Sequence, residues 1–271
     1  MNCFDITLPV DRKTETIELI VVCCLHIGHK AFDYKRATKW RNWILADKNR
    51  YAVDLGDDME NAVPGDEEHN SMMWDSNMHP EEQYRKAADY WAPVVEAGKL
   101  LLTHDSNHAW RSEAKTGISV ARNLNIFLQG LTQRHKTPEP LTDASPRWGR
   151  WQALTRLSVG RQQYLMHSWH GAGGSATPEG ALRKCRSMAT QQVADIYACG
   201  HFHQKIAWQD NRMEFSSNGR RAVEKQRTFA CTGGYLEWHE TYAERKGLSP
   251  NRRGSITLRL GAKEWDVKVG L

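Results

Sequence analysis

The chain has 271 residues, of which 40% are hydrophobic and 25% are charged. This is enough apolar material to bury one sizeable core, so we expect a single domain over residues 1–271. The net charge of +5 is a mild bias toward anionic partners, because 37 basic residues face 32 acidic ones. No apolar stretch reaches the roughly 18 residues of a membrane-spanning helix, and Met1 to Asp5 lack the pattern of a signal peptide. We therefore expect a soluble, cytoplasmic protein with no membrane partner.

The cysteines support the same expectation. Six are spread along the chain without C-x-x-C spacing, and two of them, Cys23 and Cys24, are adjacent. Adjacent cysteines are poor material for a disulfide framework, so we expect reduced thiols, as in a cytosol.

The first half of the chain predicts strands that end in polar residues. Residues 17–23 are rich in Ile and Val, the pattern of a strand buried on both faces of a sheet, and they end directly before Cys24. Residues 32–47 have apolar side chains at helical spacing, and the next predicted strand, 51–55, leads to Asp57. This order predicts a strand-helix-strand unit.

A second unit of this kind follows. Pro80 suits the first turn of a helix over residues 81–97, which Pro93 should kink or split. Residues 100–103 then form a short predicted strand that leads to Asn107. Three strands thus deliver polar residues at their carboxyl ends, as expected for loops above an α/β sheet.

The second half begins with an irregular stretch. Residues 132–150 hold three prolines and many polar residues, which predicts a long excursion or lid. Apolar patterns then predict two strands at residues 153–159 and 163–169, a helix at 178–193 and a further strand at 195–199. A hairpin around Gly261 is predicted from residues 255–260 and 265–269. Antiparallel strands at the end of the chain fit a second sheet packed on the first.

Two histidines follow the last single strand, in the string Gly200-His201-Phe202-His203. Side by side on a turn they can hold a metal ion, although one such pair occurs often by chance among 12 histidines. Four further fragments in a fixed order strengthen the interpretation: Cys24-Leu25-His26, Gly56-Asp57-Asp58, Asn107-His108 and His170-Gly171. Together they predict a dinuclear metal site.

These fragments resemble the signature of the calcineurin-like metallophosphoesterases. That signature runs D-x-H, G-D-x-x-[DEN], G-N-H-[DE], a His before Gly, and G-H-x-H, and here it spans residues 17 to 204. Each fragment alone is weak evidence, and the match is specific because of the order and spacing of the fragments. Phage and prophage members are the more similar branch, on residues 26–30, 56–62 and 107–111. The resemblance implies an α/β fold, a four-layer αββα sandwich with two central mixed β-sheets.

The resemblance also implies two divalent metal ions, either zinc, iron or manganese. The ligands of metal one would be Cys24, His26, Asp57 and His203, and those of metal two would be Asp57, Asn107, His170 and His201. Asp57 would be the bridging carboxylate, with a helix N-cap as the alternative role. His167 competes with His170, but it lies inside the predicted strand and is more typical of a packed core histidine.

Cys24 departs from the family, which has Asp at this position. A thiolate keeps the negative charge but is a soft ligand, so it would favour zinc or iron(II) over manganese or magnesium. The alternative is that Cys24 is a buried small residue, which would leave a mononuclear or disabled site.

Two further residues are candidates for catalysis. His108 resembles the family's general acid or phosphate-positioning group, and Arg111 resembles the arginine that contacts the substrate phosphate. A surface salt bridge is the alternative for Arg111. The acidic residue that the signature places after the histidine is Ala109 here, and Asp105 is a candidate substitute.

The function implied by the resemblance is hydrolysis of phosphate esters, as a phosphodiesterase of nucleotides or nucleic acids. A protein phosphatase is disfavoured, because Glu60-Asn61-Ala62 replaces the Asp-Arg-Gly of that branch. The alternative is a non-catalytic phosphate-binding module with a degenerate metal site. Met72-Met73-Trp74 is a candidate cover for a flat group such as a nucleobase, with core packing as its alternative. Natural substrate and oligomeric state stay open at this level.

Overall fold

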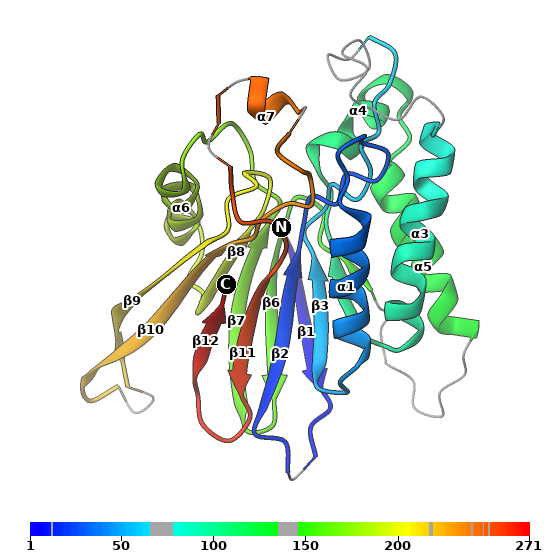
Figure 1. The fold of residues 1–271 in the computed structure, drawn as a ribbon. Helices are drawn as coiled ribbons and strands as arrows, with labels where there is room; N and C mark the ends of the chain where they lie inside the picture. The colour runs from blue at the N-terminus through cyan, green and yellow to red at the C-terminus, as the bar shows by residue number, and fades with distance from the viewer. Residues whose placement is uncertain are drawn as a thin grey trace.

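The computed structural model describes residues 1–11, 13–65, 78–134, 146–216, 219–239, 241–245, 247–248 and 250–271. Two mixed β-sheets of six strands each stack face to face, and helices cover both outer faces (Figure 1). The predicted fold class, an α/β sandwich of four layers with two central mixed sheets, is confirmed.

The first sheet contains the strands predicted in the first half of the chain. Its order is β12-β11-β2-β3-β4-β5, in which β2 to β5 run parallel and β11 is antiparallel to both of its neighbours. Its strands are β2 (Thr16–Val22), β3 (Arg50–Asp54), β4 (Leu100–Thr103), β5 (Arg147–Trp148), β11 (Ile256–Gly261) and β12 (Val267–Gly270). The predicted C-terminal hairpin is present, but its expected place in the second sheet is wrong, because β11 pairs with β2 and extends the first sheet.

The second sheet has the order β1-β6-β7-β8-β10-β9. Its strands are β1 (Asn2–Leu8), β6 (Gln152–Val159), β7 (Gln162–Trp169), β8 (Ile196–Cys199), β9 (Ile206–Phe215) and β10 (Ala222–Cys231). Strands β7, β8 and β10 run parallel, and β9 returns antiparallel along β10 as a hairpin that projects from the sandwich in Figure 1.

The helices are divided between the two outer faces. The first sheet is covered by α1 (Tyr34–Leu45), α3 (Pro80–Glu96) and α5 (Val120–Arg134), and the second by α6 (Pro178–Ser187) with the 3-10 turn η1 (Met188–Thr190). Two short helices, α4 (Asn107–Thr116) and α7 (Tyr242–Arg245), lie above the sheets (Figure 1). No helix in the described ranges is long and apolar enough to cross a lipid bilayer.

Three clusters of buried apolar side chains fill the three interfaces between layers. One lies between the sheets and includes Leu19 and Met166, a second joins the first sheet to its helices through residues such as Trp91, and the third packs α6 against Tyr197 and Phe229. Burial of apolar surface is the main stabilising term in such a sandwich.

Side-chain caps fix the first residues of helices α1 and α4. The Asp33 side chain accepts a hydrogen bond from the Arg36 backbone N–H at 2.9 Å and caps α1. Ser106 caps α4 by accepting from the Ala109 N–H at 3.3 Å. A side-chain acceptor at this position satisfies a donor that the first turn leaves unpaired. The Ser106 cap makes Asn107 the first residue of α4, directly beyond β4.

Three expectations about elements are corrected by the structure. Helix α3 runs unbroken through Pro93, because the proline lies in its last turns and the helix is held by buried Trp91 and Val94. Helix α6 ends at Ser187 rather than near 193, where the Ser187 and Thr190 hydroxyls bond main-chain carbonyls and compete with helical hydrogen bonds.

The third correction concerns residues 132–150, which were expected to form an excursion or lid. The stretch begins inside α5, and its residues Arg147–Trp148 form strand β5, which pairs with β4. The prediction is therefore wrong for the two ends of the stretch, which belong to regular elements. Residues 135–145 and the Met72-Met73-Trp74 cluster lie outside the described residues.

Candidate metal centre

Loops at the carboxyl ends of five strands carry the seven candidate ligands. They follow β2 (Cys24, His26), β3 (Asp57), β4 (Asn107), β7 (His170) and β8 (His201, His203). Three of these strands belong to the first sheet and two to the second, so the loops of both sheets meet at one edge of the sandwich. Ligands at the carboxyl ends of strands are typical of open α/β sheets.

The backbone at this edge is strained. Five of the candidates have left-handed φ angles, namely Cys24 (56°), His26 (54°), Asp57 (57°), His201 (65°) and His203 (53°). L-residues rarely adopt this region, at a cost of about 1–3 kcal/mol each when packing imposes it. Because the strained residues lie together at this edge of the sandwich, the strain indicates a functional site rather than a contribution to stability.

The first group of potential ligands consists of Cys24, His26 and His203, whose donor atoms all lie within 4.8 Å of one another. The Nε2 atoms of His26 and His203 are 3.1 Å apart, and Nδ1 of His26 lies 3.0 Å from Oε2 of Glu60. A carboxylate can only accept, so Nδ1 of His26 carries the hydrogen and Nε2 is left to bind a cation. Burial lowers the pKa of His26, but Glu60 outweighs it and raises the pKa above its ordinary value.

The second group consists of Asp57, His170 and His201, also within 4.8 Å. Nδ1 of His170 is 2.7 Å from the carbonyl oxygen of Leu55 and must donate to it. Burial lowers the pKa of His170, but Asp57 outweighs it and raises the pKa well above its ordinary value. Nε2 of the protonated ring lies 2.8 Å from Oδ1 of Asn107 and 3.3 Å from Oδ2 of Asp57, both acceptors. A cation that replaced this proton would meet an imidazole nitrogen, an amide oxygen and a carboxylate in a buried place.

The Asp57 carboxylate lies between the two groups. Its Oδ2 is 3.3 Å from Nε2 of His170 and 3.9 Å from Nε2 of His26, and its Oδ1 accepts from the His108 backbone N–H at 3.2 Å. Burial raises the pKa of Asp57, but His108 and His170 outweigh it and hold the pKa well below its usual range. The N-cap residue of α4 is Ser106, while Asp57 binds the first turn of that helix through Oδ1 and turns Oδ2 toward the two groups.

Cys24 belongs to the first group and touches a second thiol that sequence reasoning did not use. Its Sγ lies 3.1 Å from Sγ of Cys23, which in turn is 3.7 Å from Nδ1 of His170. Both thiols are fully buried, and burial raises the pKa of Cys24. A cation in the first group would oppose that effect, because a bound metal favours the thiolate.

His108 lies with His26 and Glu60 in a third group. Its Nδ1 is 2.8 Å from the Glu60 carbonyl oxygen, to which it donates, and its Nε2 is 3.2 Å from the Arg111 guanidinium. Burial lowers the pKa of His108. Arg111 also donates to the Glu60 carbonyl at 2.9 Å and lies 3.3 Å from its carboxylate. His108 is therefore a neutral ring whose Nε2 accepts a hydrogen bond from Arg111. The same Nε2 atom lies 4.0 Å from Oδ2 of Asp57.

Glu60 was not a candidate from sequence, yet it contacts His26 and His108, and this position corrects two expectations. Asp105 does not take the place of the missing acid, since it accepts from the Trp148 indole at 3.3 Å, whereas Glu60 contacts both His26 and His108. Arg111 is largely buried against Glu60, so a surface salt bridge is not its role. The available signal was the acid at the last position of the G-D-x-x-[DEN] fragment, where Glu60 stands.

The choice of His170 over His167 agrees with the geometry. The His167 ring is buried in β7 and its Nε2 lies 2.9 Å from Oε1 of Gln152 on the neighbouring strand β6. Another buried group, Cys185, Cys199 and Cys231, packs in the apolar cluster beneath α6. Buried thiols of this kind behave as small apolar residues.

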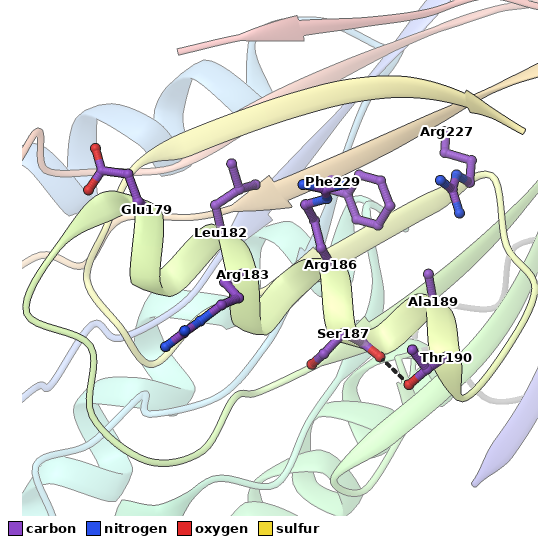
Figure 2. A pocket seen from close by; sticks show the side chains of 9 residues that line it. All are labelled: Glu179, Leu182, Arg183, Arg186, Ser187, Ala189, Thr190, Arg227 and Phe229. Carbon is purple, nitrogen blue, oxygen red and sulfur yellow. Dashed lines mark hydrogen bonds between the residues drawn. The ribbon is translucent and has the colours of Figure 1, made fainter.

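Among the described residues, two cavities that are large enough for a small molecule bear on the site. One of about 370 Å³ opens beside His203 and is lined by the segment after β10. The other, of about 700 Å³, lies against α6 and η1 and holds three arginines, Arg183, Arg186 and Arg227, but none of the candidate ligands (Figure 2). Asp210 partly neutralises it, 2.7 Å from Arg227 and 3.8 Å from Arg186. We therefore associate the site with the first cavity.

Comparison with known proteins gives distant structural similarity only. No family model and no curated protein matches the chain. A hypothetical protein, PH1004 of Pyrococcus horikoshii OT3, is 9% identical over 93% of this chain and 86% of its own, with a TM-score of 0.40. Vps29 of Chaetomium thermophilum is 12% identical over 94% and 96%, with a TM-score of 0.38. GAP50, the anchor in the inner membrane complex of Plasmodium, is 8% identical over 95% and 88%, with a TM-score of 0.37.

Proposed function

We propose that this chain is a calcineurin-like metallophosphoesterase that hydrolyses phosphodiesters of nucleotides with two divalent metal ions. The observation that carries the proposal is the position of Asp57. One carboxylate oxygen faces Nε2 of His170 at 3.3 Å and Nε2 of His26 at 3.9 Å, so a single anion is shared by two groups of converging donors. Two cations that share a bridging carboxylate are the arrangement used for phosphoryl hydrolysis.

The donor set suits such ions. Imidazole nitrogens and a thiol in the first group favour zinc or iron(II), while the second group adds the amide oxygen of Asn107. When bound, the two ions supply a polarised phosphate and a hydroxide nucleophile. The main-chain carbonyl of Leu55 and the carboxylate of Glu60 hold His170 and His26 in the tautomers that present Nε2.

His108 and Arg111 have the role of binding the phosphate and its leaving group. Arg111 is held by Glu60 and points one guanidinium nitrogen at Nε2 of His108. This Nε2 atom lies 4.0 Å from Oδ2 of Asp57. The lowered pKa of His108, caused by burial, favours a neutral ring near pH 7. We therefore assign His108 and Arg111 to positioning of the phosphate, with proton donation by His108 secondary.

One observation favours the alternative, a phosphate-binding module without turnover. Burial raises the pKa of Cys24, so a neutral thiol in contact with Cys23 offers a poor ligand for metal one. Loss of that ion would leave the Asp57, His170 and His201 group intact. Such a protein would bind phosphate without hydrolysing it.

Hydrolysis of bis-p-nitrophenyl phosphate across a panel of zinc, iron(II), manganese and magnesium separates the two functions. We expect metal-dependent turnover that Asp57→Asn removes, because the two cations lose their shared counter-charge. Asp105→Asn is the matched control, since this buried acid lies on the same edge but contacts Trp148. Binding of inorganic phosphate without turnover by any metal would favour the alternative.

A further inference from the structure

The cavity beside His203 has an opening that a glycine creates. A Cβ at Gly234 would lie 3.0 Å from Cγ of His203, so a side chain there would press on the imidazole. A Cβ at the preceding Gly233 would lie 2.7 Å from the Arg252 carbonyl oxygen and 3.3 Å from Cβ of Lys205. The chain after β10 thus passes close to the candidate ligand His203.

The wall of the cavity is a fixed aromatic surface. Trp238 donates from its indole Nε1 to the Leu248 carbonyl oxygen at 2.8 Å, and its own carbonyl accepts from the Thr241 hydroxyl at 2.8 Å. Leu236 is buried beside it. An indole whose ring is held by its own hydrogen bond presents a flat face at little further entropic cost.

Polar groups line the rest of the cavity. Asn251, which lies on its rim, makes no side-chain hydrogen bond within the described part of the chain, so its amide can both donate and accept. Arg253 donates to Oδ2 of Asp33 at 2.9 Å and lies 3.3 Å from Oε1 of Glu237, and this pairing ties the wall to the start of α1. The cavity is therefore preformed, and Arg253 in its wall is paired with acidic side chains. The candidate ligand His203 lies at one end of the cavity.

We infer that this cavity binds the nucleoside of a nucleoside monophosphate ester, with the base against Trp238, the base edge at Asn251 and the phosphate at the His203 end. The inference rests on the proposed function and narrows its substrate. Its volume of about 370 Å³ falls in the range of small-molecule sites. A site for a nucleic-acid strand needs successive stacking rings and a cationic track, whereas the described residues of this lining include one large aromatic side chain, Trp238.

Two substrates with the same leaving group test the inference: p-nitrophenyl thymidine 5′-phosphate and methyl p-nitrophenyl phosphate. Only the first carries a nucleoside. Trp238→Ala should raise KM for the thymidine ester roughly 5- to 100-fold, the range expected for loss of one base–aromatic stack, with kcat little changed. KM for the methyl ester should stay within about twofold, because nothing in that substrate reaches the wall. Asn251→Ala should alter the preference between thymidine and guanosine esters.

Trp208→Ala is the matched control, because this tryptophan is 50% exposed on β9 and lies outside the cavity lining. An equal change for both substrates in Trp238→Ala, or no change for either, would overturn the inference. So would hydrolysis of an oligothymidylate in place of the monophosphate ester.

Calorimetric titration with thymidine 5′-monophosphate separates this inference from the proposed function. If the wild-type protein hydrolyses neither ester, the proposed function fails, but binding of the nucleotide can still be measured. Binding that Trp238→Ala weakens and Trp208→Ala does not would support the cavity assignment. Absence of binding to the wild type, or equal binding by all three proteins, would contradict it.

Discussion

Cys24 is the residue at which the donor set is most unusual. If its thiolate is a ligand, Cys24→Asp should keep the first metal but move the preferred activator from zinc or iron(II) toward manganese, since carboxylate is the harder ligand. Cys24→Ser, a poorer anionic ligand, should weaken that metal selectively. Metal stoichiometry and activity of the three proteins, measured in parallel with zinc, iron(II) and manganese, provide the check. The same metal content and activator order in all three would make Cys24 a packing residue.

His108 contacts the site without belonging to either of the two groups around Asp57. His108→Ala should leave metal content unchanged and lower turnover by about 10²-fold. Because the pKa of His108 is lowered by burial and the ring accepts from Arg111, the loss should be similar for good and poor leaving groups. Steady-state kinetics on two esters of different leaving-group pKa tests this. A parallel loss of metal would show that His108 is a ligand.

His104 predicts how stability depends on pH. Its ring joins the turn after β5 to strand β7, with Nδ1 2.7 Å from the Arg150 carbonyl oxygen and Nε2 2.9 Å from Oγ of Ser168. Burial lowers the pKa of His104 from 6.5 to about 4. The folded state therefore holds this ring neutral while the unfolded chain binds a proton, so its contribution is present above pH 6.5 and is lost as pH falls toward 4.

The size of this effect can be measured by difference. Between pH 7.5 and pH 5 the wild type should lose about 2 kcal/mol of unfolding free energy through His104 alone. In His104→Asn this part of the loss should vanish, as seen from urea unfolding at both pH values. Identical pH dependence of the two proteins would show that the ring titrates normally in the fold.

At the scale of elements, the strands that end at the site were the most predictable from sequence. Strands β2, β3, β4 and β8 are short and mostly apolar, and a candidate ligand follows each within four residues, so their type and their approximate ends were clear. Strands β1 and β9 lie at the edges of the second sheet with alternating or mostly exposed side chains, and no apolar run marks them. Their position depends on pairing with distant strands, which local pattern does not encode.

The residues of the candidate site also differ in how well the sequence predicts them. Cys24, His26, Asp57, Asn107 and the three histidines stand in fragments with recognisable spacing. Glu60, Cys23 and Trp238 act through contacts across loops, and only the assembled fold shows which partners they meet. Sequence order identifies the candidate ligands, while their orientation needs the tertiary structure.

Helix α5 offers a test of its assignment, because sequence analysis did not predict it. Gly130 lies inside this helix, and a Cβ there would meet nothing within 4 Å. Gly130→Ala should therefore raise the unfolding free energy by about 0.5–1 kcal/mol. Gly117, the residue at the end of α4, is also open but has a φ of 72°, so Gly117→Ala should destabilise instead. Urea unfolding that gives both variants the same sign would contradict the assignment of one helix.

At the scale of the whole molecule, the candidate centre joins the two sheets. Asp57 and His26 follow strands of the first sheet, whereas His170 and His203 follow strands of the second. A metal ion held by both sheets binds the folded state and not the unfolded chain, so it should stabilise the sandwich as a unit. Removal of metal by a chelator should lower the Tm of the wild type and have a smaller effect on Asp57→Asn. Equal Tm values with and without chelator would contradict this coupling.

The count of metal ions per chain is the decisive measurement for the dinuclear centre, because two cations would share the Asp57 carboxylate. Equilibrium dialysis with zinc, followed by elemental analysis, should give two ions per chain for the wild type and for Asp105→Asn, and fewer than two for Asp57→Asn. One ion or none in the wild type at saturation, or an unchanged count in Asp57→Asn, would contradict the dinuclear centre.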